Sequence, residues 1–496
     1  MVFEDGVVLT CGEFLERAES FAGYLASRMR PGERVAVMLG VRAEMMIAMA
    51  AAMAVGCVPV AMDAAARAHD AGHVLRNSGS VLAILGECAS ALIEQLRPDC
   101  PALRDVIVAS ASEPNGLSAY GSETGRFPFA ESEAERHDIA AIYYTSGTTG
   151  LPKGCMLPHL WWLRLCDVHL RLTKPQPGES TLCCTPFHYT DSAYQLLCAL
   201  QTGGTLAVMR RFSVSRFWET VLRNRIVELY LIASMPILLL KAKPRPIERQ
   251  HGLRRVICAG VPASLHRELF DRFGVAFLDS YGSVEAGWNV RMPADYAVEM
   301  VGSAAMGVAV PECELRVADE ADRTVGIGEA GQLLVRAPGL FAGYLNQPEA
   351  TGEVMRGGWY HTGDLVRVDA RGFYYFLGRS KDIIRRAGEN IAAAEIEDVL
   401  RTHPGIRDAA VVAMPDEIRG EEVKAYILLG AEGTPDALPA EAIVAYCAER
   451  LASFKLPRYV EYWTGDFPRT ATMRVRKHEL AALAGPEAKA WDREAR

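Results

Sequence analysis

Residues 142–154 read IYYTSGTTGLPKG, an apolar strand-like run that leads into a segment rich in glycine, serine and threonine. Glycine lets a backbone approach a bound anion closely, and the N–H groups of such a loop bind phosphate oxygens. The segment is not a Walker A loop, because Lys153 follows Pro152 and the Gly-Lys-Ser/Thr ending is absent. A plain Gly/Thr hairpin rarely carries so many hydroxyl groups beside a lysine. The segment therefore predicts a phosphate-binding loop made of Thr145, Ser146, Gly147, Thr148, Thr149, Gly150 and Lys153.

The composition around this loop is that of an ordinary globular protein. Half of the 496 residues are hydrophobic, 23% are charged, and the formal net charge is -8. Such a chain, which has no basic tract, gives no electrostatic reason to expect nucleic acid or an anionic membrane as a partner. The 12 cysteines include no CxxC pattern and the first residues lack a basic stretch, which favours reduced thiols and a cytoplasmic location.

One apolar run, residues 45–62, contains 18 residues without a charge, which is the lower edge of membrane-spanning length. It is interrupted by Gly56 and Pro59, and Arg42 and Glu44 stand just before it. Glycine and proline break helices, so the run predicts a buried helix followed by a strand and no membrane span.

The pattern of predicted strands and helices changes along the chain, which predicts more than one domain. Strand-like runs at 33–39 and 81–85 alternate with amphipathic helices, a pattern typical of a parallel sheet with helices on both faces. From about residue 331 the strands are short and separated by turns, which favours antiparallel pairing. A small α+β unit then follows a hinge near 379–381. We predict an α/β, multidomain fold with domains at residues 1–380 and 381–496.

The loop at 142–154 matches, almost letter for letter, the phosphate-binding loop of the adenylate-forming superfamily, which holds acyl-CoA synthetases, peptide-synthetase adenylation domains and luciferases. Further segments resemble the superfamily's other motifs in the same order, from about residue 5 to residue 481. On its own, a Tyr-Gly or Gly-Asp pair would be an ordinary turn. The segments are AGVP (259–262), DSYGSVEAG (279–287), WYHTGDL (359–365), GRSKDIIRRAGENI (378–391) and FPRTATMRVRKHEL (467–480).

The resemblance implies a nucleotide site. Tyr281 would stack on adenine, Glu285 would hold Mg²⁺ near the phosphates, and Arg379 would contact the ribose or a phosphate. Asp364 would accept hydrogen bonds from the ribose hydroxyls, and a carboxylate can take two such donors at once. Three further positions complete the predicted nucleotide site: Gly260, Ser280 and Gly282.

The resemblance also implies a large N-terminal domain of mixed sheets flanked by helices and a small mobile α+β C-terminal domain, which we call the lid (residues 381–496). Lys381 would be its hinge. Ala387, Gly388 and Glu389 would line the coenzyme A tunnel. The acyl pocket would be bordered by His188, Tyr189 and Trp288, and an apolar acid (fatty, aryl or polycyclic) or its adenylate is expected to bind there.

The implied reaction has two halves. A carboxylate first attacks ATP to give acyl-AMP, and the thiol of coenzyme A then displaces AMP. Two residues depart from the family pattern: Met473-Arg474 replaces a Gly-Lys pair whose lysine serves adenylation, and Val284 replaces a threonine. We therefore expect Arg474 to support adenylation poorly and a separate adenylating enzyme to supply acyl-AMP. The alternatives are a full two-step synthetase, a carrier-protein-loading enzyme and a nucleotide-binding pseudoenzyme. A luciferase-like activity has no supporting residue.

Overall fold

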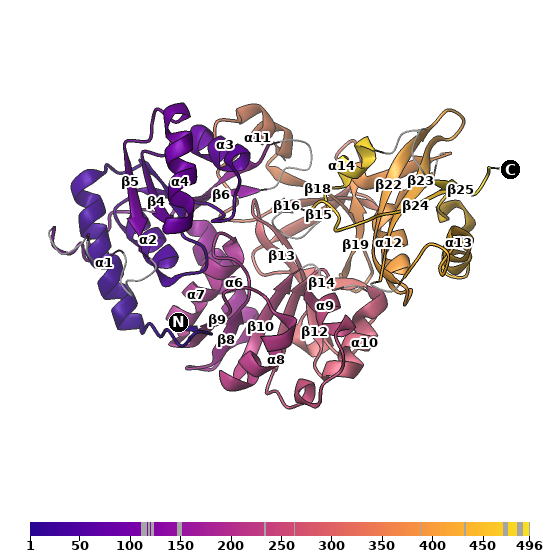
Figure 1. Ribbon diagram of the computed structural model, residues 1–496, viewed down its shortest axis with the longest axis horizontal. Coiled ribbons are helices and arrows are strands. Elements are labelled where there is room, and N and C mark those ends of the chain that lie inside the picture. Colours follow the sequence, from indigo (N-terminus) through magenta and orange to yellow (C-terminus); the bar gives the residue numbers. More distant parts are fainter. Residues whose placement is uncertain are drawn as a thin grey trace.

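The computed structural model shows a mixed α/β chain with a large N-terminal part and a small C-terminal part, as predicted (Figure 1). It describes residues 1–110, 117, 120, 124–145, 151–232, 235–261, 263–387, 389–430, 433–469, 475–483 and 490–495, without the side chains of Lys381 and Asn390.

The first sheet has the strand order β5-β4-β2-β3-β6-β7 and is parallel except at its last pair. Val35 and Val37 belong to the core that also contains α1 and α2, whereas Ala36 and Met38 belong to the core with α3 and α4. Alternate residues of a strand face opposite sides, so helices cover both faces as the alternating pattern predicts. The elements are α1 (Cys11–Arg28), β2 (Arg34–Met38), α2 (Ala43–Ala54), β3 (Val58–Ala61), α3 (Ala68–Ser78), β4 (Leu82–Gly86), α4 (Glu87–Leu96), β5 (Asp105–Ala109), β6 (Ile139–Thr145) and β7 (Lys153–Pro158).

The apolar run at 45–62 forms most of helix α2 and then strand β3, as predicted. Met45, Ala48 and Ala52 are fully buried in the protein's own core. Within the described ranges, no helix combines the length and the apolar character needed to cross a bilayer.

The second sheet is the largest and carries the site. Its order is β1-β9-β8-β10-β11-β12-β13-β14-β19-β18-β16-β15, and β17 pairs with β18. It is parallel from β1 to β12 and antiparallel beyond, which agrees with the short turn-separated strands expected after residue 331. The strands are β1 (Val2–Phe3), β8 (Ser180–Cys183), β9 (Thr205–Val208), β10 (Ile226–Ile232), β11 (Arg255–Ala259), β12 (Phe277–Ser283), β13 (Gly287–Arg291), β14 (Ala305–Ala309), β15 (Glu314–Ala318), β16 (Gly331–Arg336), β17 (Met355–Arg356), β18 (Trp359–Val368) and β19 (Tyr374–Arg379).

The helices of this region include α6 and α7, which pack against each other in the main hydrophobic core together with β13. Helices α8, α9 and α10 cover the parallel half of the sheet through a second core. The bounds are α6 (His159–Thr173), α7 (Thr190–Thr202), α8 (Val214–Arg223), α9 (Met235–Lys241), α10 (Ala263–Phe273) and α11 (Pro348–Val354).

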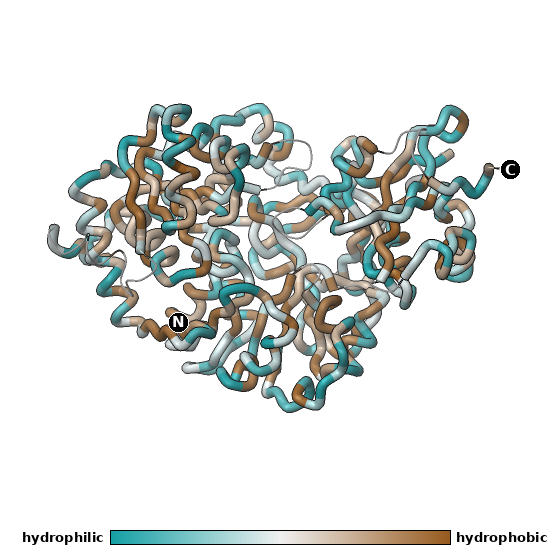
Figure 2. The backbone as a smooth tube through the Cα atoms, in the orientation of Figure 1, coloured by the Kyte–Doolittle hydropathy of each residue, from teal (hydrophilic) through white to brown (hydrophobic). Residues whose placement is uncertain are grey.

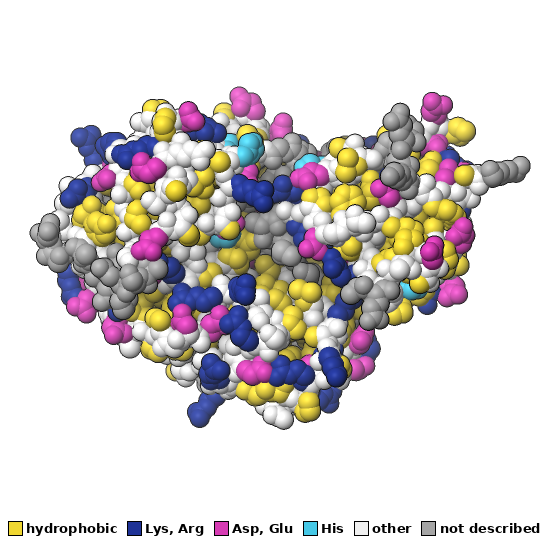
Figure 3. Space-filling view, viewed as in Figure 1, with side chains coloured by type: hydrophobic (Ala, Val, Ile, Leu, Met, Phe, Trp, Pro, Cys, Tyr) yellow, Lys and Arg dark blue, Asp and Glu magenta, His cyan; other side chains and the backbone are white. Residues whose placement is uncertain are grey.

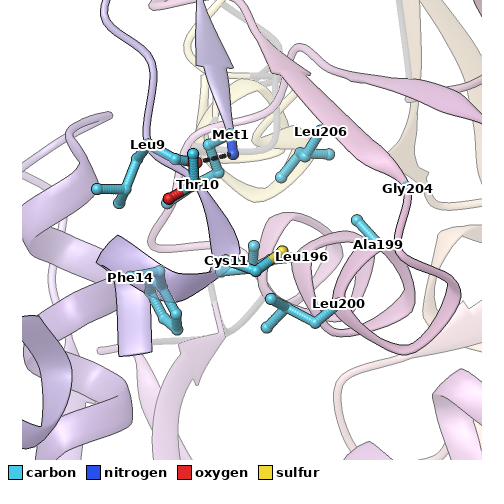
Figure 4. Close-up of a pocket in the computed structure, with 10 residues that line it drawn as sticks. All are labelled: Met1, Leu9, Thr10, Cys11, Phe14, Leu196, Ala199, Leu200, Gly204 and Leu206. Carbon is cyan, nitrogen blue, oxygen red and sulfur yellow. Dashed lines mark hydrogen bonds between the residues drawn. The ribbon is translucent and has the colours of Figure 1, made fainter. Parts of the chain in front are cut away.

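The amino terminus packs beside the C-terminal half of α7. The Met1 ammonium donates a hydrogen bond to the Leu9 carbonyl at 2.6 Å, and Thr10 begins α1 with a reciprocal cap in which its hydroxyl accepts from the Glu13 N–H at 3.1 Å. Figure 4 shows the small, mainly apolar pocket that these residues form with Leu196 and Leu200. The start of α7, next to Tyr189, is at the other end of that helix.

The third sheet forms the small C-terminal part, coloured orange to yellow in Figure 1. Its order is β21-β20-β23-β24-β25, with β22 paired to β23. The elements are β20 (Ile383–Arg386), β21 (Glu389–Ala392), α12 (Ala393–Arg401), β22 (Ile406–Asp416), β23 (Gly420–Leu429), α13 (Ala440–Ala448), β24 (Tyr459–Tyr462), α14 (Lys477–Ala482) and β25 (Trp491–Asp492).

Two side chains of the large part reach main-chain oxygens of the small part. The Lys241 ammonium donates to the carbonyls of Ile406 at 3.0 Å and Arg407 at 2.9 Å, and the Ser264 hydroxyl lies 3.4 Å from the Asp398 carbonyl. Figure 2 shows hydrophobic segments concentrated inside both parts, and Figure 3 shows acidic and basic side chains intermixed over the visible face. The small part therefore has its own core and meets the large part through polar contacts as well.

Candidate functional site

The centre of the site is a buried carboxylate on strand β18. Asp364 pairs in register with Arg379 on β19, and the Arg379 Nε atom lies 3.1 Å from Asp364 Oδ1. The Tyr281 hydroxyl, from β12, donates a hydrogen bond to Oδ2 at 2.5 Å. Asp364 is 5% exposed, and its Oδ1 accepts no well-oriented hydrogen bond from the described residues. This oxygen is ion-paired with Arg379 but keeps unused acceptor capacity, so it is suited to the hydroxyl groups of a bound ligand.

Tyr281 is held as a hydrogen-bond donor beside this carboxylate. Burial raises the pKa of the Tyr281 phenol well above its usual range, and the negative charge of Asp364 raises it further. The ring lies 6.5 Å from that of Phe376, with 32° between the planes. The structure thus brings together three of the predicted nucleotide residues, which come from positions up to 98 residues apart: Tyr281, Asp364 and Arg379.

A second carboxylate, Asp279, fixes two more of the predicted residues. Its Oδ1 accepts the backbone N–H of Ser280 at 2.7 Å and that of Gly260 at 3.1 Å. The strands β11 and β12 are parallel neighbours, so their carboxyl ends meet there. Gly260 has φ +80°, and the space where a Cβ would stand is open. Burial raises the pKa of Asp279 to about 7, although the N–H groups oppose that shift.

Gly282 is required for close packing between two strands. A Cβ at this position would lie 2.3 Å from the carbonyl oxygen of Gly287, on the antiparallel neighbour β13. No L side chain fits at that distance without moving the backbone. The glycine therefore sets the path of the chain between Tyr281 and Glu285.

Glu285 and Lys153 meet at one aromatic ring, that of Tyr344. The Tyr344 hydroxyl donates to Glu285 Oε1 at 2.8 Å, and the Lys153 ammonium lies 4.9 Å from the ring centre. Lys153 begins β7 opposite Thr145, so the two ends of the predicted phosphate loop are paired strand residues. The Thr145 hydroxyl lies 3.5 Å from the Lys153 carbonyl. This arrangement brings a cation and a carboxylate to the same tyrosine, which suits the binding of a metal–polyphosphate.

A metal ion at Glu285 would need ligands from the substrate. The described ranges contain no group of three or more His, Cys, Asp or Glu side chains placed to hold a metal. Mg²⁺ is commonly held by one or two carboxylates together with phosphate oxygens and water. The single buried Glu285 fits that kind of site.

The predicted acyl residues lie at the start of α7 and on β13. The rings of His188 and Tyr189 are 4.7 Å apart and nearly perpendicular, and His188 Nδ1 lies 3.9 Å from Asp63 Oδ1. Burial lowers the pKa of His188, which favours a neutral imidazole. Neither His188 Nε2 nor the Tyr189 hydroxyl has a hydrogen-bond partner among the described residues. Trp288 packs against the rings of two other tyrosines, Tyr194 at 6.0 Å and Tyr230 at 5.4 Å.

The small part contributes the remaining predicted residues. Lys381 lies in the short helix Ser380–Asp382, directly after β19. Ala387 has φ +51° and donates its N–H to the Arg419 carbonyl at 2.8 Å, and Glu389 begins β21. The predicted residues outside the described ranges are Ser146, Gly147, Thr148, Thr149, Gly150, Gly388, Met473 and Arg474. Arg469 and Val475, which flank the last two, form an isolated antiparallel bridge.

The sequence interpretation missed two residues that shape this site. Asp279 stands directly before Ser280 at a strand end, where an acidic residue in a buried run is a usable signal. Tyr344 has no such signal, because it is 59 residues from Glu285 and sits in no recognised motif.

Known proteins resemble this chain over almost its whole length. Residues 1–345 match the family model described as AMP-binding enzyme, and residues 395–474 match the AMP-binding enzyme C-terminal domain. A feruloyl-CoA synthase from Amycolatopsis sp is 32% identical, over 97% of this chain and 95% of that protein. ATP-bound MatB from Rhodopseudomonas palustris superimposes with a TM-score of 0.87 at 25% identity, covering 97% of this chain and 94% of that one. The o-succinylbenzoate CoA synthetase (MenE) from Bacillus subtilis, in complex with its acyl-adenylate intermediate, gives 0.84 at 25% identity, covering 97% and 94%.

Proposed function

The chain belongs to the AMP-binding enzyme family, as an acyl-CoA synthetase, and we propose that its favoured reaction is the transfer of an acyl group from acyl-AMP to coenzyme A. The observation that carries the ligase function is the buried Asp364, whose Oδ1 is ion-paired with Arg379 but accepts no well-oriented hydrogen bond, and whose Oδ2 accepts from Tyr281. Those groups suit the ribose and phosphate of an adenylate. The glycine and hydroxyl residues at 145–150 suit the phosphates of ATP or the single phosphate of acyl-AMP.

The proposed reaction needs no redox partner. The coenzyme A thiol loses its proton, its sulfur forms a bond to the acyl carbon, and the bond from that carbon to the phosphate oxygen breaks. AMP leaves with the electron pair. Arg379, held against Asp364, supplies a fixed positive charge near the leaving phosphate, and a preorganised charge of this kind stabilises the transition state.

Two residues support a weak adenylation half. Arginine at 474 keeps the positive charge of the family's lysine but replaces a compact point donor with a larger planar fork. Met473 puts a side chain where the family has glycine, and Val284 removes a hydroxyl group. Losing one preorganised donor typically costs roughly 10²–10³ in rate. A separate adenylating enzyme would then supply the acyl-AMP.

The second candidate is the full two-step reaction with ATP. It is favoured by the Glu285–Tyr344–Lys153 arrangement, which keeps the parts that bind Mg²⁺ and a polyphosphate. In that case Mg²⁺ would neutralise phosphate charge, and Arg474 would serve in place of lysine. A carrier protein in place of coenzyme A is a further acceptor to test.

We further propose that residues 1–380 and 381–496 are the moving units, with Lys381 as the hinge and the 387–389 turn as the coenzyme A contact. Lys381 lies in the short helix Ser380–Asp382 that directly follows β19, and Ala387 has a left-handed backbone with φ +51°. Domain movement lets one site present different residues to each half-reaction.

With 12 cysteines and no disulfide among the described ones, the cytoplasm suits this chain.

The proposal is tested by two assays on the same preparation. Pyrophosphate release is measured with ATP, Mg²⁺ and a panel of fatty, aryl and polycyclic acids, and thioester yield is measured with the corresponding synthetic acyl-AMPs and coenzyme A. We expect thioester from acyl-AMP together with slow or absent pyrophosphate release for the same acyl group. Rapid pyrophosphate release would favour the two-step reaction, and no thioester from any acyl-AMP would exclude the ligase function.

A further inference from the structure

A buried arginine on strand β13 has no counter-ion among the described residues. Arg291 is 3% exposed, and its Nη1 lies 3.3 Å from Nδ1 of His169 on α6. His169 Nε2 lies 2.8 Å from Glu228 Oε1, so the ring proton sits on Nε2 and Nδ1 accepts from the arginine. Burial lowers the pKa of His169, which agrees with a neutral ring. The direct partner of Arg291 is therefore uncharged.

The carboxylate beyond the histidine is already engaged. Glu228 Oε2 lies 2.6 Å from Arg255 Nε, and Arg255 also pairs with Glu179 at 2.7 Å. Although burial opposes it, the pKa of Glu228 is lowered to about 2 by His169 and Arg255. Within the described ranges, no carboxylate lies at ion-pair distance from Arg291, whereas the partly buried Arg255 of the same network has two. Buried charges are normally paired, so this exception needs a reason.

The indole N–H of Trp288 and two hydrogen-bond donors beside that ring lack an acceptor among the described residues. Arg291 Nη2, Trp288 Nε1 and the Tyr194 hydroxyl have no hydrogen-bond partner among the described residues. All three side chains are buried, at 3%, 5% and 1% exposure. The Arg291 guanidinium carbon lies 5.9 Å from the Trp288 ring centre, and the Tyr194 ring packs edge-on to the same indole. Buried polar groups are almost always paired in native proteins.

The position of these donors connects them to the proposed acyl site. Tyr194 lies on α7, which begins directly after His188 and Tyr189. Trp288 and Arg291 lie on β13, which begins two residues after Glu285. The donors therefore lie on the helix that begins at the proposed acyl residues and on the strand that follows the proposed nucleotide residues.

We propose that the acyl group carries a hydrogen-bond-accepting oxygen, as a carbonyl or ether, that binds to Arg291, Tyr194 and Trp288. This inference rests on the proposed acyl-CoA ligase function. It replaces the expectation of a wholly apolar acid by a largely apolar body with one oxygen placed away from the reacting carboxyl group. Tyr230 and Trp288 supply the apolar and aromatic surface beside that oxygen. Arg291 is thus a specificity residue, and Tyr194 supports it.

The test uses matched pairs of non-hydrolysable acyl-sulfamoyl adenosines of the aryl and polycyclic classes, which differ by one distal carbonyl or ether oxygen. Calorimetry gives the affinity ratio within each pair for the full chain. A hydrogen bond to a charged group corresponds to about a tenfold or greater preference for the oxygenated member in at least one pair. Arg291→Met should abolish that preference and leave the affinity for the oxygen-free member within about threefold.

Two further variants keep the test decisive if Arg291→Met does not fold. Tyr194→Phe removes one hydroxyl and should reduce the same ratio. Arg255→Met removes a partly buried arginine that is paired with two carboxylates, so it should lower thermal stability without changing the ratio. Equal ratios in the wild type, Arg291→Met and Tyr194→Phe, or no preference in any pair, would overturn the proposal and assign the unpaired donors to buried water.

The binding assay separates this inference from the function on which it rests. If the analogues bind with an oxygen preference that depends on Arg291, but acyl-AMP and coenzyme A give no thioester, the ligase proposal fails and the oxygen site stands. If thioester forms but the matched acyl-AMPs react with equal kcat/KM in the wild type, the ligase function stands and the oxygen site fails.

Discussion

Asp364 and Arg379 face each other across the antiparallel strands β18 and β19, and their side chains lie 3.1 Å apart without a well-oriented hydrogen bond. The arginine neutralises the buried carboxylate, yet it leaves Oδ1 able to accept donors from a ligand. The two residues thus form an ion pair in which Asp364 Oδ1 can still accept a hydrogen bond from a ligand. This ion pair also places Arg379, two residues before the proposed hinge Lys381, in direct contact with the proposed nucleotide site.

Replacing Asp364 by alanine removes that acceptor. We expect binding of a non-hydrolysable acyl-AMP to weaken by about 1.5–3 kcal/mol, the range for hydrogen bonds that involve a charged group. Calorimetry measures the change. Asp369→Ala is the matched control, because Asp369 lies in the exposed turn of the same hairpin and accepts backbone N–H groups of that turn. Unchanged affinity in Asp364→Ala would remove Asp364 from the nucleotide site.

The double change Met473→Gly with Arg474→Lys should restore adenylation. One recovered donor corresponds to a rise of roughly 10²-fold in ATP-dependent pyrophosphate release with a cognate acid. Arg476→Lys serves as the control, since its side chain pairs with Glu479 at 3.0 Å on the surface. A wild-type rate in the double variant would show that these two residues do not limit adenylation.

Lys381→Pro should trap one arrangement of the lid. Proline fixes φ and removes the backbone donor, so the variant should bind the acyl-AMP analogue normally but form thioester slowly from acyl-AMP. Lys381→Ala removes the same side chain and keeps the backbone free, so its rate should stay near that of the wild type. Equal rates in the alanine and proline variants would place the hinge elsewhere.

Tyr344→Phe deletes the hydrogen bond to Glu285 and leaves a buried carboxylate oxygen without a donor. The expected cost is about 1–3 kcal/mol of unfolding free energy, together with weaker binding of ATP in the presence of Mg²⁺. Thermal unfolding and calorimetry test the two effects. Tyr375→Phe is the control. It removes a 3.0 Å hydrogen bond to Asp369 at a less buried position, so ATP binding should stay unchanged.

Asp279 should make stability depend on pH. Its pKa is about 7 in the folded protein against 3.8 for the free side chain, so the folded state holds a proton that the unfolded state has released. The contribution of this group is therefore largest below pH 3.8 and is lost as the pH rises towards 7.

The measurement is the thermal midpoint of the wild type minus that of Asp279→Asn. This difference should fall as the pH is raised from 5 to 7.5. Asp319→Asn is the control, because the pKa of Asp319 is lowered by its contacts with Arg323 and its pH window lies below 3.8. A constant difference for Asp279 over this range would contradict the raised pKa.

The sequence predicted the parallel sheet and its helices well, because buried strands such as 34–38 and amphipathic helices such as α1 carry strong local patterns. It placed Tyr281, Asp364 and Arg379 in one site through their motifs, and the structure places them in contact. It did not predict the role of Tyr344, because contact with Glu285 depends on how distant segments pack. Arg291 was also missed, since a single arginine at a strand end is ordinarily exposed.

Lys241 and Ser264 bind main-chain atoms of the C-terminal part, whereas Arg385 and Glu320 pair through their side chains. Lys241 and Ser264 donate to carbonyl oxygens at 406, 407 and 398, which exist whatever side chains stand there. Substitutions at those three positions can therefore accumulate without loss of these contacts, provided that the backbone path is kept. A C-terminal part of different sequence that follows the same backbone path would therefore keep the contacts of Lys241 and Ser264.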